Sequence, residues 1–212
     1  MDSDPRPTLD AHLQLGDQAI RMLEISRELF MKQRRELIAE VLALGQKVHK
    51  VEKQLTGQLA GDHPDADRIF VAMHFERIGD CLESFAKAVG RLMDDGIVMT
   101  DRANREIDTL LAKNIELLEA ARDIIRSGSA LLIRFVLTEG PAFEALANEY
   151  SAFHEQRLIQ GLCQPKASSV YLAIVDYLRG VEQHTRAIVS KLASSPELAA
   201  AVSKALSHFT PV

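Results

Sequence analysis

Two carboxylates lie four residues apart in an otherwise apolar stretch of this 212-residue chain. They are Glu76 and Asp80, within the sequence His74-Phe75-Glu76-Arg77-Ile78-Gly79-Asp80. Positions i and i+4 of a helix lie on the same face, so the two charges repel each other unless a cation or a basic side chain lies between them. The pair therefore either binds something or faces solvent.

A bound metal ion is the chemistry that this pair would support. His49 and Glu52 are three residues apart, share a helix face in the same way, and are candidate further ligands. Three carboxylates and an imidazole would suit Zn, Fe, Ni or Mn, and also Mg if water completes the coordination shell. The alternative is that Glu76 and Asp80 pair with basic side chains or lie on a solvated face, and from spacing alone this is the simpler interpretation.

The composition predicts an all-α protein that places these side chains on helices. Hydrophobic residues make up 47% of the chain and aromatic residues only 5%, and there is no Trp. The dominant residues, Leu, Ala, Ile, Glu, Gln, Arg and Lys, lose little on entering a helix. The seven prolines lie near the termini or at apparent breaks, where they end helices.

Charge and cysteine content exclude several classes of protein. The net charge of -5 argues against a nucleic-acid-binding surface, which needs clustered Lys and Arg in excess. Cys81 and Cys163 form no C-x-x-C motif, and the N-terminus lacks the apolar segment of a signal peptide, so we expect a cytoplasmic protein. No run reaches the roughly 18 apolar residues of a membrane span, so any action at a membrane would go through a partner.

Apolar periodicity and breakers predict the order of the helices. Residues 10–60 read as a helical hairpin with its turn at Lys32 to Arg35. Capping residues at Asp65 and at Thr100-Asp101 predict a third helix to about Asp94 and a fourth to Ile125, or on to Leu137. Glu139-Gly140-Pro141 predicts a break, a fifth helix from there to Leu162, and a sixth from Ser168 to about Ser194. A short helix is expected after Pro196.

This order suggests an internal duplication of three-helix units. Aligning His49 with His154 and Glu76 with Arg179 gives spacings of 105 and 103 residues, as one small loop insertion would produce. We therefore expect a first bundle at 10–96, a second at 100–194 and a C-terminal tail at 195–212. In the second half, Asp80 aligns with Gln183 as well, so the carboxylate pair exists only in the first half.

The sequence Glu76-Arg77-Ile78-Gly79-Asp80 resembles the signature of the PhoU family of phosphate-uptake regulators. These proteins are built from two three-helix bundles with an E-x-x-x-D signature on the third helix of each. The second half, from His154 to His184, is similar to the PhoU-like domain of bacterial sodium/phosphate cotransporters. In that branch the second signature is degenerate around an Arg and a His, which fits Arg179 and His184.

The resemblance implies two tandem three-helix bundles and an accessory regulator that docks onto a membrane phosphate transporter or its sensor. It also implies metal at Glu76 and Asp80. PhoU proteins with metal clusters use acidic residues on the second helix too, where this chain has Gly45 and His49 and retains Glu52. A multinuclear cluster is therefore not expected, and the second-half site is lost. A homodimer is an option that the sequence leaves open.

The sequence contains none of the catalytic motifs that would indicate an enzyme. There is no Gly-rich phosphate loop, no H-E-x-x-H, no G-x-S-x-G and no pair of Glu-x-x-His motifs for a di-iron bundle. His154, Arg157 and His184 could form an anion pocket, but helical surface residues are the simpler interpretation. Cys81 is expected to be a small core residue. The alternative to phosphate regulation is a metal-binding helical bundle or a scaffold unrelated to phosphate.

Overall fold

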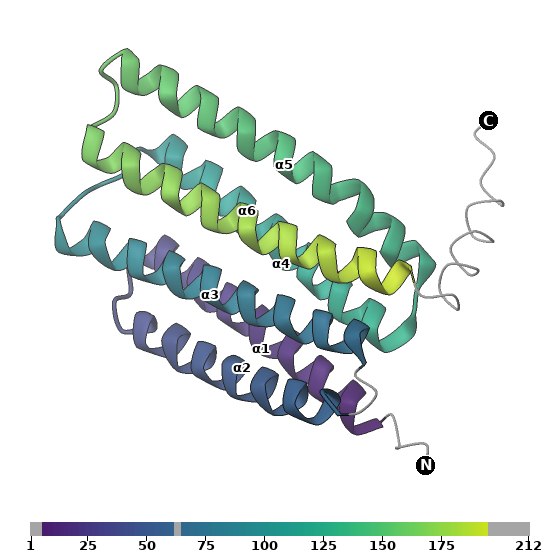
Figure 1. Cartoon of the computed structure of the whole chain (residues 1–212). Helices are drawn as coiled ribbons and strands as arrows, with labels where there is room; N and C mark the ends of the chain where they lie inside the picture. Colours follow the sequence, from purple (N-terminus) through teal and green to yellow (C-terminus); the bar gives the residue numbers. More distant parts are fainter. Residues whose placement is uncertain (1–5, 62–64, 195–212) are drawn as a thin grey trace, which may run out of the picture.

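The computed structural model describes residues 6–61 and 65–194, and within these ranges α-helices joined by short connections are the only regular secondary structure. The helices, shown in Figure 1, are α1 (Arg6–Lys32), α2 (Leu37–Leu59), α3 (Ala66–Asp94), α4 (Asp101–Ser127), α5 (Ala130–Ile159) and α6 (Pro165–Ala193). The predicted all-α class is confirmed. In these ranges no helix is both long enough and apolar enough to cross a membrane.

The six helices pack as two sets of three that share one hydrophobic core. Helices α1, α2 and α3 contact one another, and so do α4, α5 and α6. Across the two sets, α3 lies along α6 and α1 along α4, so equivalent helices meet. Contacts between equivalent elements are what a pseudo-twofold axis produces. The domain boundaries near residues 96 and 195 stay a prediction.

Local signals define most helix ends as the sequence predicts. The turn after α1 has Gln33 in a left-handed conformation, and its side-chain amide donates a hydrogen bond to the Phe30 carbonyl. The Asp65 carboxylate accepts from the Arg68 amide at the start of α3. The Thr100 hydroxyl accepts from the Ala103 amide at the start of α4. Each side chain satisfies a backbone group that the helix itself leaves free.

The predicted break between the fourth and fifth helices is in the wrong place. Helix α4 ends at Ser127, followed by Gly128 as its C-cap with a φ of 62°, and the Ser129 hydroxyl caps α5. Helix α5 then continues through Gly140-Pro141, where the sequence predicts an end. Pro141 lies on the exposed face, so water can replace the hydrogen bond that proline removes.

Packing against α6 explains why α5 continues past Gly140. Gly140 is buried, and a β-carbon built on it would collide with the Glu182 carboxylate and with Arg186. Glu182 is only 1% exposed and accepts from the Arg186 guanidinium at 2.7 Å, which also reaches Glu144 at 3.0 Å. The glycine that suggests a break is therefore a site of close helix packing.

The sixth helix begins at Pro165, three residues earlier than predicted, because proline suits the first turn of a helix. It ends at Ala193, close to the predicted end. The helix expected after Pro196 lies outside the described residues.

Helices α3 and α6 run antiparallel, and the contacts between them form a seam that joins the two halves of the chain. Along it, Asp67 pairs with Lys191 at 2.6 Å, and the Nδ1 atoms of His74 and His184 lie 3.1 Å apart. Further on, a β-carbon on Gly180 would meet the Cys81 sulfur at 2.7 Å. Cys81 is half-buried against the core, as predicted, and burial raises the pKa of its thiol to about 11.

Gly140→Ala should destabilise the protein although alanine favours helix. The gain in helix propensity is about 0.5–1 kcal/mol, and displacing the buried Glu182 and Arg186 costs about 1–3 kcal/mol, so we expect a net loss of about 1–2 kcal/mol. Urea unfolding followed by circular dichroism measures it. The matched control is Gly57→Ala in α2, where no described atom lies within 4 Å of the new β-carbon. It should stabilise by about 0.5 kcal/mol, and an equal loss in both variants would contradict the packing argument.

The histidine pair in the seam should make stability depend on pH. Burial, the charge of His184 and the charge of Arg77 lower the pKa of His74 to about 4, and burial and Arg77 lower that of His184. Below the unfolded pKa of about 6.5, the unfolded chain therefore binds more protons than the folded protein, and stability falls on acidification.

We expect the free energy of unfolding to fall by roughly 1 kcal/mol between pH 7 and pH 5 through His74, after allowance for its partial exposure. Denaturant unfolding of the wild type and of His74→Leu at both pH values measures this difference. The variant should lose less stability than the wild type over the same interval. Identical pH dependence in both proteins would show that the pair titrates alike in the folded and unfolded states.

Candidate functional site

The residues with the strongest sequence signal line a groove between α2 and α3, here called the acidic groove. Its volume is about 210 Å³. Helix α3 contributes Glu76, Gly79, Asp80 and Glu83, and α2 contributes Gly45, Gln46 and His49. The spacing 76, 80 and 83 places the three carboxylates on one face of α3. The periodicity of α3 therefore concentrates negative charge along one side of the first bundle.

His49 of α2 and Glu76 of α3 contact each other across the groove. The His49 Nδ1 lies 3.3 Å from a Glu76 carboxylate oxygen, where the imidazole donates when Nδ1 carries the hydrogen. The His49 side chain is 62% exposed and the Glu76 side chain 26%. Asp80, one turn further along α3, is exposed. The groove is thus open to solvent and to any partner that approaches this face.

Three of the four predicted metal ligands lie in the groove, and the fourth does not. Glu52 is absent from its lining, and its carboxylate accepts a hydrogen bond from the Thr56 hydroxyl at 2.8 Å on its own helix. Glu52 follows His49 by three residues on α2, and its hydrogen bond to Thr56 is local to that helix. The structure therefore brings together His49, Glu76 and Asp80.

Glu83 is a groove residue that the sequence interpretation missed. The signal was present, because Glu83 follows Asp80 by three residues and Glu76 by seven, which is the same helix face. The Glu83 carboxylate fills the space beside Gly45, where a β-carbon would collide with it. It also accepts from Lys87 at 3.0 Å. Gly45, which stands where an acidic residue is expected in the metal-bearing PhoU proteins, instead makes room for this acid.

The groove is acidic, but its side chains do not converge as a finished metal site. Among the described residues, no three His, Cys, Asp or Glu side chains are placed to hold a metal ion together. Glu76 faces His49, and Glu83 is held by Lys87. To chelate an ion, Asp80 and Glu83 would have to turn toward Glu76. The metal assignment of Glu76, Asp80, Glu52 and His49 stays a prediction.

The second half uses the corresponding positions differently. Arg179, which aligns with Glu76, reaches across to α5 and donates to the Ser151 hydroxyl at 3.2 Å, and also lies 3.4 Å from Asp176. Gln183, which aligns with Asp80, is exposed. The same pair of helices is thus bridged in both halves, by a carboxylate in the first and by a guanidinium in the second.

The three residues considered as an anion pocket lie in two separate places. His184 contacts His74 in the seam. His154 and Arg157 lie together near the other end of the second half, where Arg157 binds the buried Glu106 through two hydrogen bonds of 3.0 and 2.8 Å. The charge of Arg157 is thereby matched inside the protein. The structure does not bring the three residues together.

Comparison with known proteins agrees with this arrangement. Residues 13–89 match the family model described as the PhoU domain. The chain is similar to the solved structure of PhoU from Pseudomonas aeruginosa, with a TM-score of 0.80 and 14% identity over 93% of this chain and 100% of that one. It is also similar to the phosphate transport system regulatory protein PhoU from Streptococcus pneumoniae, with a TM-score of 0.74 and 11% identity over 89% and 92% of the two chains.

No curated protein sequence matches the chain significantly. At identities of 14% and 11%, the structural similarity shows the fold, and the family model adds the sequence relationship for the first half. The matched segment contains every residue of the acidic groove. Residues 13–89 are therefore similar in sequence to a PhoU domain, and the fold of the chain is similar to that of the two PhoU structures.

Proposed function

We propose that this protein regulates phosphate transport by binding other proteins. The observation that carries the proposal is the PhoU family match of residues 13–89 within a PhoU fold that extends over 93% of the chain. One of the two similar structures is described as a regulatory protein of a phosphate transport system. In this proposal, the protein acts by docking onto a membrane phosphate transporter or its sensor and catalyses no reaction.

The acidic groove supplies a surface suited to such docking. Glu76, Asp80 and Glu83 project from α3, whose apolar side packs into the core, so the carboxylates are held on a rigid element. Asp80 is exposed and Glu76 and Glu83 are partly exposed, so carboxylates on this fixed spacing attract and orient basic side chains of a partner. We propose that the partner presents Lys or Arg residues to this groove, with Arg favoured because it binds carboxylates through two hydrogen bonds.

A metal ion in the groove is the second part of the proposal. Glu76 and Asp80 would bind it together with His49, and water would complete the shell because the groove is open. The ion would be Fe, Zn, Ni, Mn or Mg, and it would link the groove to carboxylate or phosphate oxygens of a partner. Glu52 is the weakest of the four candidates because it lies outside the groove lining.

Deleting the gene should change phosphate uptake or phosphate-responsive expression in the host. Radiolabelled phosphate uptake and a phosphate-responsive reporter measure both effects, and wild-type protein supplied in trans should restore them. The double variant Glu76→Gln with Asp80→Asn should fail to restore them while accumulating to the wild-type level, because it removes the groove charge without changing side-chain size.

The matched control is Glu149→Gln, which neutralises one exposed carboxylate on α5. It should complement the deletion like the wild type. If the deletion leaves both uptake and expression unchanged, regulation of phosphate transport is the wrong function. If the double variant complements fully, the regulation is real but the groove is not its docking surface.

Protein purified without chelator or histidine tag should contain metal that depends on the groove. Elemental analysis should find about one ion per chain in the wild type, and Glu76→Gln or Asp80→Asn should reduce occupancy at least tenfold, because each substitution removes a charged ligand. Glu52→Gln should retain most of the metal. Equal metal content in the wild type and both groove variants would exclude this site.

A further inference from the structure

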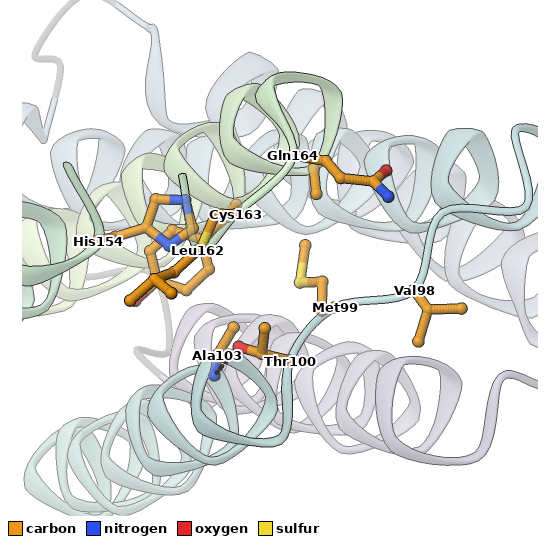
Figure 2. A pocket seen from close by; sticks show the side chains of 10 residues that line it. Val98, Met99, Thr100, Ala103, His154, Leu162, Cys163 and Gln164 are labelled. Atoms are coloured by element: carbon orange, nitrogen blue, oxygen red, sulfur yellow. Dashed lines mark hydrogen bonds between the residues drawn. The ribbon is translucent and has the colours of Figure 1, made fainter. Parts of the chain in front are cut away.

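A cavity of about 180 Å³ lies at the end of the second bundle and shares no lining residue with the acidic groove. Four segments enclose it: the connection before α4, the start of α4, the end of α5 with its following loop, and the start of α6 (Figure 2). Its lining residues are Val98, Met99, Thr100, Ala103, His154, Leu162, Cys163, Gln164, Ala167 and Tyr171. We call it the end cavity. None of the functional assignments above uses it.

His154 is the buried polar residue of the end cavity, and its tautomer is fixed by its neighbours. The residue is 3% exposed, and its ring stacks on Tyr171 with centroids 4.0 Å apart. An Arg157 guanidinium nitrogen lies 3.2 Å from its Nδ1. Because a guanidinium can only donate, Nδ1 must be the acceptor and carry no hydrogen. The neutral imidazole then has its hydrogen on Nε2.

Two further observations support the neutral form with Nε2–H. Burial and the charge of Arg157 lower the pKa of His154, so the ring is neutral at pH 7. Arg157 is itself held in place by Glu106, which also accepts from the Tyr171 hydroxyl at 2.7 Å. The group that determines the tautomer is therefore anchored on the side away from the cavity.

The Nε2–H of His154 has no hydrogen-bond partner among the described residues. A buried donor left unpaired costs about 1–3 kcal/mol, so native proteins rarely keep one without a reason. An acceptor atom bound in the end cavity would satisfy it. The unpaired donor therefore points to a ligand that brings an acceptor oxygen.

Helix starts add donors at the same place. At the start of α6, the Ser168 amide donates to the Gln164 carbonyl and begins the helical hydrogen-bond pattern. The amides of Lys166 and Ala167 come before it and have no acceptor within the helix. The Gln164 side chain makes no capping bond to them. Helix α4 begins at the same cavity, and two helix N-termini favour a negative charge between them.

The rest of the lining is mixed, with Thr100, Cys163 and Gln164 beside an apolar part. Met99 and Ala167 are buried, while Leu162 and Val98 at the mouth are 65% and 88% exposed. Large exposed apolar side chains around a cavity are typical of a binding site for an apolar group. The ligand thus needs both an acceptor oxygen and a small apolar part.

We propose that the end cavity binds a small aliphatic carboxylate. A carboxylate oxygen accepts from His154 Nε2–H, the negative charge faces the start of α6, and the aliphatic chain packs against Met99 and Leu162. The inference does not depend on the regulatory function proposed above, and its failure would leave that function untouched.

The fixed tautomer of His154 argues against a metal ion as the ligand of the end cavity. Cys163 and Met99 carry sulfur atoms in the same lining and would suit a soft metal. A metal ion needs a free lone pair on a histidine nitrogen, yet Arg157 uses the lone pair of Nδ1 and the hydrogen occupies Nε2. Inorganic phosphate fits less well than a carboxylate because it has no apolar part to cover the apolar walls.

Isothermal titration calorimetry with sodium 4-methylpentanoate tests the proposal on the full-length protein. We expect saturable binding of one molecule per chain. The uncharged isostere 4-methylpentanamide should bind at least tenfold more weakly, since hydrogen bonds to a charged acceptor are stronger. Inorganic phosphate should bind at least tenfold more weakly as well. A lack of saturable carboxylate binding would overturn the proposal, and equal or tighter phosphate binding would overturn the choice of an aliphatic ligand.

Two variants locate the binding. His154→Phe keeps the stacking on Tyr171 but removes the Nε2–H donor, and it should weaken carboxylate binding at least tenfold. Ala167→Leu fills the cavity and should abolish binding. The control is Gln183→Phe, which introduces the same aromatic side chain at an exposed position of α6 and should bind like the wild type. Unchanged affinity in both cavity variants would show that the ligand binds elsewhere.

NMR on the wild-type protein can locate the bound carboxylate even if a variant does not fold. In ¹H–¹⁵N NMR spectra, 4-methylpentanoate should shift the amide resonances of Lys166 and Ala167 more than those of residues lining the acidic groove, such as Gln46. Saturable binding without shifts at the start of α6 would overturn the proposal in the same way as unchanged affinity in the variants.

Discussion

The antiparallel packing of α3 against α6 is the contact on which the rest of the structure depends. Helix α3 touches α6 through His74 and Cys81, and it fills the core of its own half through Phe75, Ile78 and Leu82. The remaining side of α3 carries Glu76, Asp80 and Glu83, together with the exposed Arg77 and Lys87. The seam therefore fixes the orientation of α3 and, with it, the direction in which the groove carboxylates project.

The two halves share one helical arrangement but place their acidic side chains differently. In the first half, a glycine on α2 makes room for Glu83, and the acids stay near solvent. In the second half, Gly140 on α5 makes room for Glu182, which is buried and paired with Arg186. Glu106 is likewise buried and paired with Arg157. The groove carboxylates of the first half thus lie near solvent, whereas Glu106 and Glu182 of the second half are buried and paired with arginines.

The sequence was sufficient for the fold class and most helix ends, because those depend on local periodicity and capping. It was insufficient at Gly140-Pro141, where the local break signal is overridden by packing between α5 and α6 that only the tertiary structure reveals. The same limit applies to the site. Spacing alone placed Glu76 and Asp80 on one face, whereas the separation of Glu52 from the groove and of His184 from His154 depends on how helices pack.

The seam also constrains how the chain reaches its folded state. His74 and His184 are 110 residues apart, whereas the contacts within each half join helices that are neighbours or next neighbours along the chain. Local contacts form faster than distant ones, so each half should assemble before the two dock. During synthesis, the face of α3 that later meets α6 has no intramolecular cover until nearly the whole chain has been made. Over that interval, α6 of another copy could dock there instead, which makes helix exchange between chains the characteristic misfolding hazard of this architecture.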